Sequence, residues 1–323
     1  MKVKGIIFKV LLFATGIFVG IFALAFLGQT IFNATYNPPQ KITYGVTFSP
    51  KYAEYLSLDW KQTFIKSLDE LNIKNLRIPT YWSDIEGRMG EFNFEDVDFM
   101  IDETEKRGAK VILVVGFRQP RWPECYIPFW ARRLGLKEKR ANILQFIQKT
   151  VERYENRESV WAFQVENEPF LMFFGEDCDK GDEVFLKTEV NLVRELSNKT
   201  IIVSDSGELG NWIIPMQLSD IFGTTLYRDV YNPLMGNFSY PILPYFYNLK
   251  SQIIRSIFAK NNQKTIIVEL QAEPWIGADD LRNNPQKQAQ FFPIHKLKSY
   301  VDYAEKSGFD EIYLWGVEWW YWM

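Results

Sequence analysis

Two glutamates that each follow a short apolar run are the residues of this chain best suited to do chemistry. Glu168 stands in the sequence Glu-Asn-Glu-Pro at 166–169, directly after the run Val160–Val165. Glu269 ends a second apolar run about a hundred residues later. A carboxylate at the end of a buried strand is costly to desolvate unless it has a partner or a function. Two such carboxylates are what hydrolysis of a glycosidic bond requires, one as acid/base and one as nucleophile.

The composition argues against most other catalytic chemistries. The single histidine, His295, lies in a predicted helix, which disfavours Ser-His-Asp catalysis and His-rich metal sites. The sequence contains neither of the Gly-rich motifs that cradle phosphates. We therefore expect no metal and no organic cofactor. The net charge of −3 argues against nucleic acid as a partner, and the 16% aromatic content suits core packing and stacking on sugars.

The amino-terminal residues predict a membrane segment. Three lysines within the first nine residues precede an uncharged stretch from Val10 to Gly28, which with residues 5–8 is long enough to span a bilayer. The tripeptide Ala-Leu-Ala at 23–25 is similar to a signal-cleavage site, but the apolar run continues past it, which favours an uncleaved anchor. We expect a transmembrane signal anchor at 1–28 and a tether at 29–40. The basic flank predicts a cytoplasmic amino terminus and an extracytoplasmic domain, with secretion after cleavage as the alternative.

The remaining residues, 41–323, have the length and the alternation of one (β/α)₈ TIM barrel. Repeated alternation of strands with amphipathic helices implies a parallel sheet, and the count of eight favours closure over an open, doubly wound sheet. Because only seven residues follow Gly316, the sequence predicts that the eighth helix is missing. The expected strands are Ile42–Phe48, Leu76–Pro79, Val111–Gly116, Val160–Val165, Ile201–Asp205, Ile221–Leu226, Thr265–Glu269 and Glu311–Gly316.

Polar residues at the carboxyl ends of these strands define the expected site, since this end carries the active groups of such barrels. Arg77 lies in the second strand and Tyr227 follows the sixth. Asn167 and Glu168 follow the fourth strand, and Glu269 closes the seventh. The alternation therefore predicts that the two glutamates face each other, with the arginine and the tyrosine beside Glu269.

The tripeptide Asn-Glu-Pro at 167–169 resembles the motif of the clan A retaining glycoside hydrolases, (β/α)₈ enzymes that include family 5 cellulases and family 42 β-galactosidases. Glu269 matches the nucleophile position of that clan and Arg77 matches its strand-two arginine. Residues 79–94 are also similar to the segment after strand two in these enzymes, and the resemblance covers roughly residues 43–316. The strand-three histidine common in family 5 is absent, because residues 115–118 read Val-Gly-Phe-Arg. The exact family is therefore left open between family 5 and another family of the clan.

The resemblance and the chemistry together imply a role for each residue. Glu168 must begin protonated to donate to the leaving oxygen, and burial near a second carboxylate raises the pKa of such a group. Glu269 must be ionised to attack the anomeric carbon, with Arg77 as the cation and Tyr227 as the hydroxyl donor. Asn167 is expected to bond the sugar 2-hydroxyl, and carboxyls about 5–5.5 Å apart imply retention.

Two further glutamates offer alternatives. Glu273 is the rival nucleophile, but it stands about 13 Å further along an extended strand, so that only one of the two can face Glu168. We favour Glu269 because it closes the apolar run directly, whereas Glu273 precedes a proline in the loop. Glu166 has the same strand parity as Glu168, and we expect it one layer lower, as a buried partner of Arg77.

Tryptophans on the same face are expected to stack on sugar rings. Trp315 ends the eighth strand, a place where the clan commonly has its sugar platform. Trp82 and Trp275 lie in loops on this face and are expected to bind substrate, against the alternative that they pack in the core.

The two cysteines lie in adjacent loops of the expected barrel. Cys125 follows the third strand and Cys178 follows the fourth, and consecutive loops of a barrel emerge side by side. An extracytoplasmic domain can keep a disulfide, which predicts a Cys125–Cys178 bond rather than two unrelated thiols.

We therefore expect a membrane-anchored, extracytoplasmic O-glycosyl hydrolase that cleaves a β-linked oligo- or polysaccharide by double displacement. A transglycosylase on the same site, a catalytically silent carbohydrate-binding barrel and a purely structural tethered module are the alternatives. The sequence does not predict the sugar, the linkage, the endo or exo preference, or the oligomeric state. The loop Tyr231–Leu249, rich in Pro and Tyr, is the expected determinant of specificity.

Overall fold

The computed structural model describes residues 39–323 except 173, 233, 261 and 277–283, together with 15, 16, 20, 23, 26–28, 30 and 34. The predicted anchor at 1–28 and the predicted tether at 29–40 thus lie largely outside the described residues. Within the part of the chain that is described, no helix has both the length and the apolar character needed to cross a bilayer.

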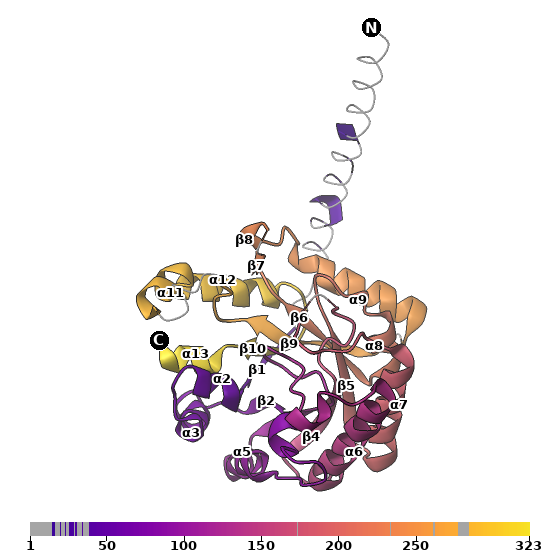
Figure 1. Cartoon of the computed structure of the whole chain (residues 1–323). Helices are drawn as coiled ribbons and strands as arrows, with labels where there is room; N and C mark the ends of the chain where they lie inside the picture. Colours follow the sequence, from indigo (N-terminus) through magenta and orange to yellow (C-terminus); the bar gives the residue numbers. More distant parts are fainter. Residues whose placement is uncertain are drawn as a thin grey trace.

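Eight parallel strands close into a barrel at the centre of the molecule (Figure 1). Neighbours in the chain pair with one another, and the first strand pairs with the last, Thr43 opposite Glu311. All eight predicted strands are confirmed, with ends that shift by one or two residues. The strands are β1 (Thr43–Thr47), β2 (Asn75–Pro79), β3 (Lys110–Val115), β4 (Val160–Val165), β5 (Thr200–Asp205), β6 (Ile221–Leu226), β9 (Lys264–Gln271) and β10 (Glu311–Trp315).

Helices cover the outside of the barrel (Figure 1). Several start where a side chain accepts a hydrogen bond from the free N–H groups of the first turn, as Asp59 and Asp182 do. The helices are α2 (Pro50–Tyr55), α3 (Trp60–Glu70), α4 (Trp82–Ile85), α5 (Glu95–Lys106), α6 (Leu136–Tyr154), α7 (Glu183–Leu196), α8 (Ile213–Leu218), α9 (Pro244–Phe258), α11 (Pro285–Phe291) and α12 (Ile294–Glu305). Of these, α5, α6, α7, α8 and α12 pack directly against the strands of the barrel. A 3₁₀ turn, Phe129–Ala131, lies in the loop after β3.

The residues after β10 correct one expectation. Val317–Trp322 form a short helix, α13, which packs against α2 and α3 and covers the flank predicted to lack a helix. Six residues are too few for a stable isolated helix. This one is held by its side chains: Trp319 is buried, and the indole N–H of Trp320 donates to the carbonyl of Ala272 at 2.8 Å. The prediction of a missing eighth helix was wrong because it considered only the length of the segment. It did not consider the aromatic side chains that hold this segment against the barrel.

The loop after β6 contains two strands that were not predicted from the sequence. β7 (Asp229–Asn232) and β8 (Gly236–Ser239) form an antiparallel hairpin, and the rest of the expected Tyr231–Leu249 loop runs into α9. The side chain of Asp229 accepts hydrogen bonds from the hydroxyls of Ser239 and Tyr300 and is paired with Lys296. These contacts tie the hairpin to α12.

Candidate active site

Glu269, in β9, is held by two donors from opposite sides of the barrel. Nη1 of Arg77, in β2, donates to Oε1 at 2.7 Å, and the hydroxyl of Tyr227 donates to Oε2 at 2.9 Å. Arg77 is fully buried, so its charge acts on Glu269 with little screening by water. The predicted contacts of Arg77 and Tyr227 with Glu269 are confirmed, and Arg77 and Glu269 form a buried ion pair.

The guanidinium of Arg77 is fixed by further acceptors on β4 and in the loop that follows it. Nε donates to Oε1 of Gln164 at 2.7 Å, and Nη2 donates to Oδ1 of Asn167 at 2.6 Å. Because Oδ1 of Asn167 faces the arginine, the Nδ2 group of the same amide is turned away from it. The predicted site residues Arg77, Asn167 and Glu269 thus form one connected network.

Glu168 lies buried beside the same network. Its Oε1 accepts from the hydroxyl of Thr225 at 3.0 Å, and its backbone N–H donates to the hydroxyl of Ser204 at 3.2 Å. Thr225 is paired in register with Glu269 on the neighbouring strand, so one threonine adjoins both glutamates. Burial raises the pKa of Glu168 well above its ordinary value, and the charge of Glu269 raises it further. These conditions favour a protonated acid beside an ionised partner.

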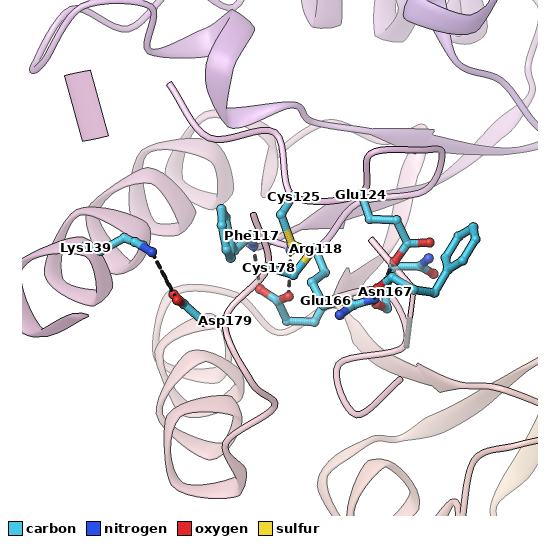
Figure 2. The surroundings of a disulfide bond; sticks show 10 residues. Phe117, Arg118, Glu124, Cys125, Lys139, Glu166, Asn167, Cys178 and Asp179 are labelled. Carbon is cyan, nitrogen blue, oxygen red and sulfur yellow. Dashed lines mark hydrogen bonds and ion pairs between the residues drawn. A yellow bond between two sulfur atoms is a disulfide. The ribbon is translucent and has the colours of Figure 1, made fainter. Parts of the chain in front are cut away.

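A third buried carboxyl, that of Glu124, is a residue that the sequence did not single out. It accepts from Nη2 of Arg118 at 2.7 Å in the loop after β3 (Figure 2). Burial raises the pKa of Glu124 to about 7, opposed by the charge of Arg118 and assisted by that of Glu269. Glu124 in turn contributes to the raised pKa of Glu168. The loop that carries Glu124 has no alternating strand pattern. The neighbouring Cys125 is therefore the one sequence signal that could have identified Glu124.

Glu273, the alternative nucleophile, forms an ion pair with Arg121. Both of its carboxylate oxygens bond the guanidinium of Arg121, which also donates to Glu318 at 2.9 Å. The guanidinium lies 3.7 Å from the ring centre of Tyr52 and 4.1 Å from that of Trp315. This geometry makes Glu273 a partner of Arg121 and favours Glu269 as the nucleophile.

The three tryptophans predicted to bind substrate occupy different surroundings. Trp275 lies at the site, with its ring centre 5.4 Å from that of Tyr227 and 5.2 Å from that of Phe174. Trp315 is buried and stacks on Arg121, and its role as a sugar platform stays a prediction. Trp82 lies outside the site: its side chain is fully buried in the core and donates to Glu86 at 2.7 Å. The prediction for Trp82 was wrong because α4 turns the ring inward.

Comparison with protein families identifies the family to which this chain belongs. A match to the family described as Cellulase (glycosyl hydrolase family 5) extends over residues 40–311, most of the chain. The chain belongs to glycosyl hydrolase family 5. The question left open by residues 115–118 is thereby resolved, since the absence of a histidine there does not exclude membership.

Solved structures share the fold of this family 5 chain at low sequence identity. GH5_18 from Bifidobacterium longum subsp. longum is similar with a TM-score of 0.62 and 12% identity, over 85% of this chain and 70% of that one. GH5_18 from Streptomyces cattleya, in complex with GlcNAc, has a TM-score of 0.60, 11% identity and the same coverages. A β-galactosidase from the psychrophilic Marinomonas ef1 has a TM-score of 0.54 and 14% identity over 84% of this chain, which spans 54% of that protein's length. No curated protein matches the sequence.

Glu166 supports the loop after β3 in this family 5 barrel and does not bond Arg77, which corrects our expectation. Its carboxylate accepts from the backbone N–H groups of Phe117 at 2.5 Å and of Arg118 at 2.7 Å (Figure 2). A side chain at Gly116 would collide with it, since an added Cβ would lie 2.3 Å from Oε1 of Glu166. β4 ends at Val165 and Glu166 has a left-handed φ of 61°, so strand parity no longer decides where its side chain points.

Glu189, on α7, is a buried neighbour of Glu166 and gives the family 5 fold a testable pH dependence. Burial and the charge of Glu166 raise the pKa of Glu189 well above its ordinary value, and the two carboxyls share a hydrogen bond. A group with a raised folded pKa stabilises the fold below its unfolded pKa, about 4.3, and this stability is lost as the pH rises through the folded pKa.

We expect Glu189→Gln to reduce the loss of stability with rising pH. The amide still donates to Glu166 but cannot ionise. Above about pH 5, the unfolding free energy of the variant should therefore fall less steeply with pH than that of the wild type, by up to about 1.4 kcal/mol per pH unit. Denaturant unfolding of both proteins over a series of pH values measures this slope. Identical slopes would show that Glu189 is not protonated in the folded protein.

The predicted disulfide between Cys125 and Cys178 is confirmed, with the two Cα atoms 5.3 Å apart (Figure 2). It joins the loop after β3 to the loop after β4. Arg118 reinforces the junction, because its Nη2 donates to the carbonyl of Phe174 as well as to Glu124. Lys139 and Asp179 form a further ion pair at 3.1 Å on the outer side. The disulfide therefore restrains the loop that carries Glu124.

We expect the paired substitution of Cys125 and Cys178 by serine to lower stability more than activity. The bond closes a loop of 53 residues, which the chain-entropy model values at about 4 kcal/mol, equivalent to a fall of roughly 8 °C in the melting temperature. Thermal unfolding of the variant and of the oxidised wild type measures the difference. Thiol titration of the denatured, unreduced wild type is the control, and two free thiols per chain would reject the bond.

Proposed function

We propose that this family 5 protein hydrolyses a β-linked glycan with retention of anomeric configuration, with Glu269 as the nucleophile and Glu168 as the acid/base. One observation carries the proposal. Both oxygens of Glu269 are held by a cation and a neutral hydroxyl, while Glu168 is buried beside the same threonine with a raised pKa. Two carboxyls in opposite protonation states at one place are what double displacement needs.

In the first step, an oxygen of Glu269 attacks the anomeric carbon while Glu168 transfers its proton to the leaving oxygen. The bond to the leaving group breaks and a glycosyl ester of Glu269 forms. Burial is the main cause of the raised pKa of Glu168, and esterification removes the second cause, the negative charge of Glu269. Glu168 is then a carboxylate of lower pKa, suited to take a proton from the water that releases the sugar.

Two neighbours of Glu269 are proposed to assist this reaction. Burial and the charge of Glu269 raise the pKa of Tyr227 well above its ordinary value, so its hydroxyl stays a neutral donor. Asn167 presents Nδ2 away from Arg77, which leaves this group to donate to the sugar 2-hydroxyl, an interaction that strengthens in the oxocarbenium-like transition state.

Aromatic side chains support an oligo- or polysaccharide as substrate. The ring centre of Phe174 lies 5.2 Å from that of Trp275 and 5.2 Å from that of Trp122, which is half exposed. Tyr227, whose hydroxyl bonds Glu269, contacts the ring of Trp275 and so joins this cluster to the site. The rings meet edge-on or tilted, and a cluster of such apolar rings beside the site suits sugar rings, which pack on aromatic side chains through their C–H groups.

The test is a screen of the full-length protein in detergent on 4-nitrophenyl β-glycosides and β-linked polysaccharides. Manβ1-4GlcNAc belongs in the panel because a GH5_18 variant of similar fold from Bifidobacterium longum is solved in complex with it. For any substrate that is cleaved, proton NMR of the first product formed should show the β-anomer. The α-anomer as first product would contradict double displacement.

The same screen separates the alternatives. A transglycosylase would release the leaving group yet transfer the sugar to an added glycan acceptor faster than to water. A silent carbohydrate-binding barrel would bind glycans without releasing any product from the whole panel. The geometry favours catalysis over both binding alone and a purely structural role, because Glu168 and the ion-paired Glu269 adjoin one threonine at the strand ends of the barrel.

We also propose that residues 1–28 anchor the protein in a membrane with the barrel on the extracytoplasmic side. The uncharged stretch from Val10 to Gly28 supports the anchor, and the disulfide supports an oxidising compartment. Protease treatment of sealed vesicles carrying the full chain tests the orientation. Release of the protein into the medium would instead indicate secretion after cleavage.

A further inference from the structure

The outer face of α9 carries a row of exposed apolar side chains. Their spacing of three and four residues places them on one side of the helix, while Tyr247 and Ser251 on another side pack against the barrel. Ile257 is the most exposed of these apolar side chains, at 65%. The row, called here the α9 stripe, consists of Phe246, Leu249, Ile253 and Ile257.

The α9 stripe is unusual among the helices around this barrel. Among the described residues, each of the other labelled helices exposes at most one large apolar side chain. The tip of the β7–β8 hairpin, which precedes α9 in the chain, adds Leu234, 95% exposed, and Met235. Several large apolar side chains exposed on one helix mark a site of association with a membrane or a partner.

The amino-terminal chain arrives at the same helix. A methyl group built on Gly28 would lie 3.1 Å from the hydroxyl of Tyr245, in the first turn of α9. Figure 1 shows the described residues Phe26–Gly28 on the side of the barrel that carries α9 and the β7–β8 hairpin. Gly28, the last residue of the uncharged stretch in the sequence, therefore lies against α9.

We propose that the α9 stripe rests on the lipid bilayer that holds the amino-terminal segment, with the Leu234–Met235 tip beside it. The inference rests on the proposed anchorage and not on the proposed glycosidase activity. An anchor that ends at α9 keeps the stripe close to the lipid, so even weak interfacial affinity suffices for stable contact. A second copy of the chain is a poorer occupant, because stable protein interfaces use about 20–30 residues a side.

The contact would place the site close to the membrane. Tyr227 lies two residues before the hairpin, so the loop that carries a donor to Glu269 also carries the lipid-facing tip. The hairpin is fixed at its base, because Oε1 of Gln271 accepts from the backbone N–H groups of Arg228 and Asp229. Lipid contact at the tip would thereby hold the orientation of the site relative to the bilayer.

The test uses an environment-sensitive dye on a single introduced cysteine, which the chain permits because both of its own cysteines are disulfide-bonded. Ile253→Cys places the dye on the α9 stripe. Glu95→Cys places it on the exposed start of α5, on the opposite side of the barrel, as a matched control (Figure 1). The full chain is reconstituted into phosphatidylcholine vesicles with a minor share of phosphatidylglycerol, and flotation reports the anchorage.

We expect the dye at Ile253 to shift to shorter wavelength in vesicles and to lose most of its emission to spin-labelled lipids, and the dye at Glu95 to do neither. A chain that floats while its Ile253 dye stays in water overturns the lipid contact but not the anchor. A dye that is shielded yet not quenched by spin-labelled lipid also overturns it, because a second copy or the chain's own segment then covers the stripe. A chain that does not float overturns both anchorage and contact, whatever its activity on glycosides.

Discussion

Replacing Glu269 by alanine is expected to abolish turnover, with a loss of at least about 10⁴-fold in kcat, the scale on which removal of a catalytic nucleophile acts. Added azide should restore part of the activity, because it is small enough to occupy the space left by the carboxylate. The restored product should be an α-glycosyl azide, since azide attacks the face that Glu269 attacked. Rate measurements with and without azide, followed by NMR of the product, check both parts.

Glu273→Ala is the matched control for this prediction. Glu273 differs from Glu269 in its partner, because it bonds Arg121 and not Arg77. The control variant should lose some stability, since it removes the charge facing a buried arginine, but azide should not change its rate. Azide rescue of the Glu273 variant and not of the Glu269 variant would reverse the assignment of the nucleophile.

Glu168→Ala should lower kcat/KM by roughly 10²–10⁴-fold on substrates with poor leaving groups and far less on those with good ones. A good leaving group departs without a proton, so the missing acid matters little in the first step. Azide added to this variant should give a β-glycosyl azide, the opposite anomer from the Glu269 variant. Equal losses on both kinds of substrate would contradict the acid role.

The pH profile supplies a separate check on Glu168. Its folded pKa is raised by burial and by Glu269, so the wild type should stay active to a higher pH than an ordinary glutamate, near 4.3, would allow. As the pH rises through that raised pKa the acid is lost and kcat/KM falls. In Glu168→Gln, measured on a substrate with a good leaving group, this alkaline limb should be absent.

The sequence could predict the barrel and the centre of the site because both depend on regular periods. Each strand is a short apolar run, and the ends of such strands meet on one face whatever the loops do. This was enough to bring Glu168, Glu269 and Arg77 together. The contacts of Tyr227 with Glu269 followed from the same rule, since it stands directly after a strand.

Residues outside the regular elements could not be predicted in this way. Glu166 leaves the strand pattern through a left-handed backbone, and Glu124 lies in a loop whose path is set by Arg118 and a disulfide. Arg121 is placed by two aromatic rings and two carboxylates from distant segments, none of which leaves a local signal. α13 forms because its aromatic side chains pack against the barrel. The surface that they cover exists only once the barrel has assembled, so the local sequence does not predict the helix.

The closure of the barrel by β1 and β10 has a consequence for how the protein is made. The two strands come from opposite ends of the barrel sequence, so β1 leaves the ribosome long before its partner exists. Until β10 emerges, β1 and β9 present unpaired edges that can template pairing with other chains. Barrel closure is therefore a late folding event with a high entropic barrier, and nascent chains are most exposed to aggregation just before β10 is synthesised.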